Sequence, residues 1–291
     1  MDIVFHMGAN CTDEDRLLKS LLKNGDTFAD YGTKVPGPGK YRRLIRETIQ
    51  SLDGAQPEPE TRTHILEEML DGDTADRVVL SNANFICVPN RVFEKGVFYN
   101  QAEAKIRGLL SLFPQENIEL CLALRDPATF VPEVFAKSKA VKFEGYMKGY
   151  HPALIRWSEL VRRIRNTAPQ CKLTVWCNED TPMLWPRLIR TLSGVPDDTV
   201  IDGGYDLLAA IMSTEGMTRM LAYMRSHPPK TDAHKHKIIA AFLGKYAIPE
   251  EMEDVVDLPG MTEASIAELT ALYDADVDQI SQMEDVNFIL P

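Results

Sequence analysis

The chain has 291 residues, with 32 basic and 43 acidic side chains and a formal net charge of −11. This acidic balance argues against general nucleic-acid binding, and no apolar run approaches the roughly 20 residues that a membrane-spanning helix needs. The N-terminus lacks the basic segment of a secretory signal. We therefore expect a cytoplasmic globular protein without a membrane span and without a nucleic-acid partner.

The first residues predict a strand, a glycine turn and a helix. Residues 3–5 are apolar, Gly8-Ala9-Asn10 follow, and leucines then recur at helical spacing. Thr12 and Asp15 stand as in a capping box, so we expect the helix to open at Thr12. In this arrangement free N–H groups and the helix dipole point at the loop, which favours anion binding.

Three further buried strands are expected, near residues 79, 121 and 175. Because strand and helix alternate, we predict an α/β fold with a parallel sheet of about four to five strands flanked by helices. Residues 1–195 form this core, and residues 196–291 form a helical C-terminal layer or lid on the same domain. Helices are expected over residues 40–51, 61–70, 100–112, 130–149, 154–166, 182–192, 205–225, 235–243 and 265–283.

The opening sequence resembles that of the bacterial sulfotransferase family, which has the P-loop fold. In that family the strand ends in a His-x-Gly-Ala-His-Lys-Thr-Gly-Thr-Thr sequence, and the loop cradles the 5′-phosphosulfate of the donor 3′-phosphoadenosine 5′-phosphosulfate (PAPS). The matching residues are His6, Gly8, Ala9 and Thr12. The departures are Cys11 at the lysine position and Asp13, Glu14 and Asp15 at the Gly-Thr-Thr positions.

A second part of the resemblance lies at Arg125, after the third expected strand, with Pro127 two positions on. In the family this arginine and a serine eight residues later hold the 3′-phosphate of the donor; the serine position here is Glu133. The resemblance covers most of the chain in the order of its elements. It implies a sulfotransferase-like P-loop fold and sulfuryl transfer from PAPS to a hydroxyl or amine, on a carbohydrate or small-molecule acceptor.

The resemblance also implies site residues. His6 is the candidate base or orienting residue, and the first loop and Arg125 are candidates to bind PAPS. Ser81, Asn82 and Asn84 follow the second expected strand, at the sheet edge where α/β sites form, and are candidate substrate contacts. The candidate donor-binding residues are Gly8, Ala9, Asn10, Thr12, Arg16 and Arg125.

The residues by themselves leave other interpretations open. His6 also fits a core histidine, Arg125 an ion pair or helix cap, and residues 81–84 a polar turn. The basic residues of segment 40–46 form either a solvated helix face or an anion-binding surface beside the first loop. A reactive Cys11 at a helix N-terminus is opposed by the carboxylates that follow it.

Three consecutive carboxylates at residues 13–15 would repel a bound polyanion. A second hypothesis is therefore a non-catalytic protein of this fold that binds a glycan, a metabolite or a protein partner. A third is a transferase with another donor, in which residues 13–15 hold a cation or a sugar hydroxyl.

Neither cysteines nor histidines predict a metal site. His234 and His236 are two residues apart and face different sides of a helix. The cysteines are scattered without a Cys-x-x-Cys pair, which predicts buried free thiols in a reducing compartment. They are Cys11, Cys87, Cys121, Cys171 and Cys177.

Overall fold

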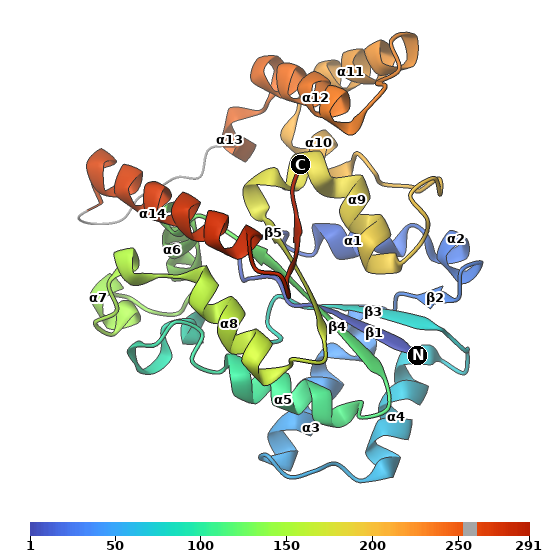
Figure 1. Ribbon diagram of the computed structural model, residues 1–291, viewed down its shortest axis with the longest axis vertical. Coiled ribbons are helices and arrows are strands. Elements are labelled where there is room, and N and C mark those ends of the chain that lie inside the picture. Colours follow the sequence, from blue (N-terminus) through green and yellow to red (C-terminus); the bar gives the residue numbers. More distant parts are fainter. Residues whose placement is uncertain (253–260) are drawn as a thin grey trace.

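The computed structural model describes residues 1–252 and 261–291. Within these residues the strands form one six-stranded, all-parallel sheet with the order β2-β3-β1-β4-β5-β6 (Figure 1). The predicted α/β fold class is confirmed. The four strands located in the sequence are β1, β3, β4 and β5, and two short edge strands complete the sheet. The strands are β1 (Asp2–His6), β2 (Thr33–Lys34), β3 (Arg77–Ser81), β4 (Asn117–Leu124), β5 (Lys172–Cys177) and β6 (Asn287–Ile289).

Helices cover both faces of the sheet (Figure 1). Side chains alternate along β1, so that Ile3 and Phe5 enter one core and Val4 enters the other. The face of Ile3 is covered by α3 (Arg42–Leu52), α4 (Pro59–Leu70), α5 (Ala102–Leu112), α6 (Pro127–Ala136), α7 (Phe143–Met147), α8 (Trp157–Thr167) and α14 (Glu263–Ser281). The face of Val4 is covered by α1 (Arg16–Leu22), α2 (Gly25–Ala29), α9 (Thr181–Ser193), α10 (Asp206–Ile211), α11 (Thr214–Ser226) and α12 (Asp232–Tyr246).

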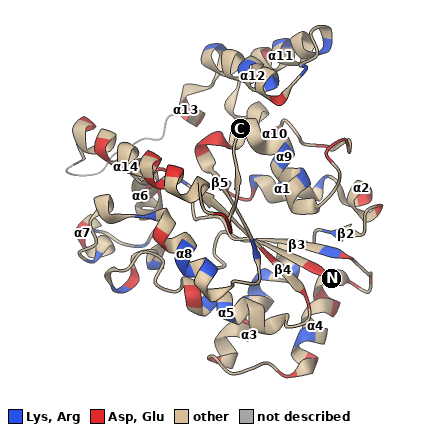
Figure 2. Ribbon diagram, viewed as in Figure 1, with Lys and Arg blue, Asp and Glu red and all other residues tan. Residues whose placement is uncertain are grey.

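The C-terminal region contributes to both faces and to the sheet itself. Helices α10 to α12 extend the layer of α9, whereas α14 packs against α8 and α6 on the opposite face (Figure 1). Strand β6 then pairs with β5, with Ile289 beside Trp176. Helix α14 carries acidic residues and no Lys or Arg (Figure 2). None of the helices described is both long enough and apolar enough to cross a membrane.

The first helix begins at Arg16 and not at Thr12. The reason is the backbone of the preceding loop: Cys11, Glu14 and Asp15 have φ angles of 58°, 50° and 64°. These values belong to the left-handed region, which a right-handed helix cannot include. The apolar periodicity of the leucines gave the helix correctly, but it could not reveal this irregular entry.

Two long helices expected from the sequence are each broken. The helix over residues 130–149 is divided into α6 and α7, because the Ser138 hydroxyl donates to Phe135 O at 2.7 Å and accepts from the Ala140 N–H at 3.2 Å. Such local bonds compete with the helical pattern. The helix over residues 205–225 is divided into α10 and α11, because Ser213 caps a new helix by accepting the Gly216 N–H at 3.2 Å.

Candidate functional site

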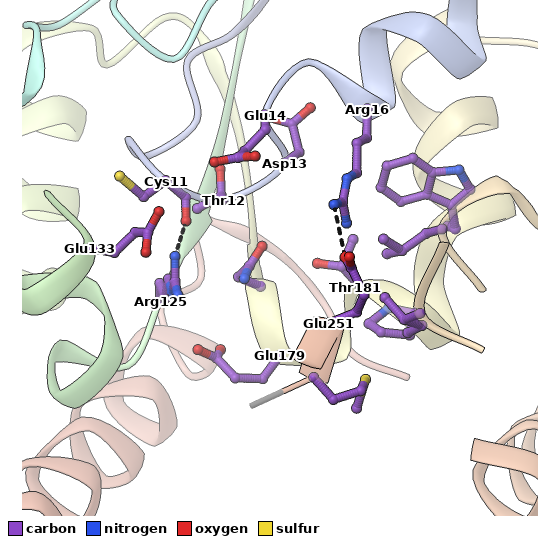
Figure 3. Close-up of a pocket in the computed structure, with 16 residues that line it drawn as sticks. Cys11, Thr12, Asp13, Glu14, Arg16, Arg125, Glu133, Glu179, Thr181 and Glu251 are labelled. Carbon is purple, nitrogen blue, oxygen red and sulfur yellow. Dashed lines mark hydrogen bonds and ion pairs between the residues drawn. The ribbon is translucent and has the colours of Figure 1, made fainter. Parts of the chain in front are cut away.

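In the sheet, β2 and β3 lie on one side of β1, and β4, β5 and β6 lie on the other side. The order of the strands therefore reverses between β1 and β4, which makes the space beyond their carboxyl ends a topological switch point. A pocket of about 380 Å³ opens there at the carboxyl ends of β1, β4 and β5 (Figure 3). Its described walls come from residues 11–14 of the first loop with Arg16 of α1, from Arg125 after β4, and from Asn178, Glu179, Thr181 and Pro182 after β5. Helix α10 and α13 (Pro249–Met252) close another side.

The backbone of the first loop is engaged with the protein itself. The Ala9 N–H donates to Ala123 O at 2.8 Å, and Ala123 N–H donates to Gly8 O at 2.5 Å, so pairing with β4 continues past the end of β1. The Asn10 N–H donates to the Tyr99 hydroxyl at 3.1 Å. Gly8 has a φ of +83°, and a Cβ there would lie 3.1 Å from Ala83. The N–H groups of Ala9 and Asn10 are thus already used.

The N-terminus of α1 is capped by a carboxylate of the chain. Asp13 Oδ2 accepts the Leu17 N–H at 3.1 Å. The Thr12 hydroxyl instead donates to Ala9 O at 2.8 Å, and Asp15 makes no side-chain cap. The predicted capping pair of Thr12 and Asp15 is therefore wrong, because the left-handed turn moves the helix start and brings Asp13 into the capping position.

Carboxylates outnumber cations among the described residues that line the pocket. Arg16 lies 3.5 Å from Glu251 in an ion pair, and Lys137 pairs with Glu133 at 3.1 Å and with Glu14. The charged residues of the described lining are Asp13, Glu14, Glu133, Glu179, Glu251, Arg16 and Arg125 (Figure 3).

Arg125 reaches the first loop from the end of β4 (Figure 3). Its guanidinium donates to the carbonyl oxygen of Cys11 and, through Nε, to the Thr129 hydroxyl at 3.1 Å. The Arg125 backbone carbonyl accepts from the Trp157 indole at 2.9 Å. The residue is 7% exposed. It therefore both fixes the loop and presents a positive group to the pocket.

Glu179 is a charged pocket residue that the sequence analysis did not select as a site residue. It follows β5, and its carboxylate accepts the Asp126 N–H at 2.8 Å and the Tyr273 hydroxyl at 2.9 Å. Enclosure by the surrounding protein raises the pKa of the Glu179 carboxyl. Its position directly after a buried strand was the available signal, since such residues reach the carboxyl edge of a parallel sheet.

His6 and Ser81 lie beneath the loop and are not among the described residues that line the pocket. His6 is 1% exposed, its Nδ1 lies 2.9 Å from Ser81 Oγ, and its ring stacks on Trp176 with a centroid distance of 5.6 Å. Burial lowers the pKa of His6, and the opposing effect of the nearby carboxylates is smaller. His6 is therefore a neutral core group at pH 7.

We expect acidification to destabilise the protein through His6. Below pH 6.5 the unfolded chain binds a proton at His6 that the folded chain does not, so the free energy of unfolding falls as pH falls. The loss grows as the pH falls from 7 through the ordinary histidine pKa of 6.5 toward 5, because the unfolded chain takes up the proton there and the buried ring resists it. Urea unfolding at several pH values measures it. His6→Gln should flatten the pH dependence, whereas the exposed control His64→Gln should retain it; equal slopes in both variants would contradict the assignment.

The predicted donor and substrate residues do not converge on one cavity. Thr12, Arg16 and Arg125 line the pocket at the switch point, whereas Asn82 and Asn84 line a second cavity on the other side of the first loop. Asn10 is buried, and its amide connects the loop to the segment after β3. It donates to Ala83 O, Asn84 Oδ1 and Cys87 O at 3.1, 3.0 and 3.1 Å and accepts from the Tyr99 hydroxyl at 2.8 Å.

The chain matches no family model, and no curated protein matches it. Among residues 1–252 and 261–291, no group of three His, Cys, Asp or Glu side chains is placed to hold a metal ion. Burial raises the pKa of Cys11 to about 11, so this thiol is protonated at neutral pH.

Proposed function

We propose that this chain is a sulfotransferase-like protein that does not use PAPS and instead binds a small metabolite carrying amine and hydroxyl groups. The observation that carries the proposal is the carboxylate of Asp13 at the N-terminus of α1. An anionic donor requires this position and its free N–H groups. In this chain the carboxylate of Asp13 occupies the N-terminus of α1 and accepts the Leu17 N–H.

The charge of the pocket supports the same conclusion. Carboxylates prevail over guanidinium groups along its described lining, and a pocket with this balance attracts cations and repels anions. Each carboxylate has more acceptor sites than its contacts use; Glu179, for example, accepts one bond at each oxygen. Ligand N–H and O–H groups therefore find acceptors without displacing the internal bonds.

A second candidate, sulfuryl transfer from PAPS to a hydroxyl or amine, is favoured by Arg125 and Arg16. Both line the pocket and are candidate donor-binding residues, and Arg125 also donates to the Cys11 carbonyl of the first loop. As a base for this reaction, His6 would have to act on the acceptor indirectly, through the buried Ser81 hydroxyl that its ring contacts. The acidic lining and the engaged loop amides weigh against this candidate.

Calorimetric titration with D-glucosamine, compared with D-glucose, tests the proposal. We expect saturable binding of glucosamine and weaker binding of glucose, because only the amine carries a charge. Glu179→Gln keeps the shape of the side chain and should weaken glucosamine binding about tenfold, the effect of losing one charged hydrogen bond. The matched control Glu68→Gln, on the exposed face of α4, should leave it unchanged. Binding that is absent, or unaffected by Glu179→Gln, would refute the proposal.

A further inference from the structure

A second cavity, of about 290 Å³, lies between α3, α5 and the segment that follows β3. Its described lining contains cationic and amide side chains but no carboxylate. It lies beside the first loop, because Asn84 accepts a hydrogen bond from Asn10. The polar lining residues are Arg42, Arg46, Arg91, Lys105, Asn82, Asn84, Gln50 and Gln101.

Three of the four cations have carboxylate partners at the rim. Arg42 binds both oxygens of Asp15, at 2.9 and 2.5 Å. Arg46 lies 3.4 Å from Glu47, and Arg91 lies 3.2 Å from Glu94. The side chains of Arg46 and Arg91 remain more than half exposed beside these partners, so both cations stay accessible to a ligand.

Lys105 is the cation that the described protein does not compensate. Within residues 1–252 and 261–291 its ammonium group has no hydrogen bond and no ion pair, although the side chain is half-buried. Burial, and then repulsion by Arg91, lowers the pKa of Lys105. An anion beside Lys105 would offset both costs.

The cavity has one apolar wall and continues into a neighbouring groove. Ile45, Phe85 and Leu109 are buried and line it beside the cations. Lys105 and Ile49 also line an adjoining groove of about 570 Å³ between α3 and α5, so the two spaces share a wall. The groove is mixed in character, since Ile49 and Leu52 are apolar whereas Asp53 and Arg107 are charged. A ligand with an anionic head and a small apolar body that lies against Ile49 and Leu52 fits this arrangement.

We propose that the cavity between α3 and α5 binds a small phosphate monoester, with its phosphate between Lys105 and the guanidinium groups of Arg46 and Arg91 and its apolar body along the groove. A phosphate monoester brings three acceptor oxygens and a charge between −1 and −2 at neutral pH, so it can engage several of these cations at once, whereas a carboxylate brings two oxygens and one charge. The site is separate from the acidic pocket, and the inference does not depend on the proposed metabolite.

Isothermal titration with phenyl phosphate at low salt and pH 7.5 tests the proposal, with inorganic phosphate and benzoate as comparisons. We expect saturable binding of phenyl phosphate, and at least tenfold weaker binding of either comparison. Lys105→Met and Arg91→Gln should each weaken phenyl phosphate binding about tenfold or more. The control Lys237→Met, which removes an exposed lysine of α12, should leave the affinity unchanged.

Folding is not at risk in the key variant, because Lys105→Met removes an uncompensated, half-buried charge; circular dichroism and urea unfolding check this. Equal affinity for phenyl phosphate in Lys105→Met and Lys237→Met would overturn the proposal, as would absence of saturable binding. Benzoate binding as tight as phenyl phosphate would overturn the assignment of a phosphate. Inorganic phosphate binding as tight would overturn the role of the groove. Because Glu179→Gln should leave phenyl phosphate binding intact, failure here is distinguishable from failure at the acidic pocket.

Discussion

Replacement of Asn10 by alanine should lower the free energy of unfolding by about 3 kcal/mol, because it leaves several buried polar groups without partners. The amide of Asn10 bonds to Ala83 O, Cys87 O and the Tyr99 hydroxyl. Asn10 is 2% exposed, so its partners lie away from bulk water and losing their bonds carries a desolvation cost. Chemical denaturation of the two proteins measures the difference.

The matched control for this loss is Asn84→Ala. Asn84 is exposed and shares only one bond with Asn10, at 3.0 Å, so the change should cost less than about 1 kcal/mol. Tyr99→Phe removes the hydroxyl that serves both the amide and the backbone N–H of Asn10. The destabilisation caused by Tyr99→Phe and that caused by Asn10→Ala should therefore be non-additive in a double-mutant cycle. Similar losses in Asn10→Ala and Asn84→Ala would contradict the role assigned to Asn10.

Trp157→Ala should destabilise the protein by about 4 kcal/mol, the cost of a large cavity in a well-packed aromatic cluster. Trp157 is 1% exposed and packs edge-to-face on Phe98 and Phe130, with ring centroids 5.0 and 5.3 Å away. Its indole also donates to Arg125 O at 2.9 Å. Differential scanning calorimetry should show a correspondingly lower melting temperature.

Trp157→Phe separates packing from hydrogen bonding. It keeps an aromatic ring against Phe98 and Phe130 and loses the bond to Arg125 O, so we expect about half the loss of Trp157→Ala. Tyr99 belongs to the same cluster, with its ring 6.1 Å from Trp157. If Trp157→Ala unfolds at the same denaturant concentration as wild type, the aromatic cluster does not make the contribution to stability that we assign to it.

The strands of the core were predictable because their side chains are apolar and their lengths are short. Residues 77–81 and 117–124 have apolar side chains that point to both sides of the strand. Such runs are typical of a parallel sheet that is covered by helices on both faces. Strand β2 is two residues long and carries too little pattern to be located. The entry to α1 was missed because the left-handed backbone of Glu14 and Asp15 is a local conformation that periodicity does not encode.

The site was predictable in part. Thr12, Arg16 and Arg125 were expected together and do line one pocket. Asn82 and Asn84 line a different cavity, and the bonds of Asn10 to Ala83 and Asn84 hold this segment across more than 70 positions of the chain. Such long-range partners cannot be inferred from spacing along the chain. The hydrogen bonds of the Ala9 and Asn10 N–H groups could not be predicted for the same reason, because their acceptors are in β4 and at Tyr99.

The most direct test of our account is a thermal-shift and calorimetric titration with 3′,5′-adenosine bisphosphate, the desulfated form of PAPS, on wild type, Arg125→Ala and Lys105→Met. A ligand that binds only the folded state stabilises it by about 2.7 kcal/mol at 100 times its dissociation constant. We predict no saturable stabilisation that depends on Arg125. Stabilisation that is lost in Arg125→Ala and retained in Lys105→Met would show that the pocket at the switch point accepts the PAPS skeleton, and would contradict our account.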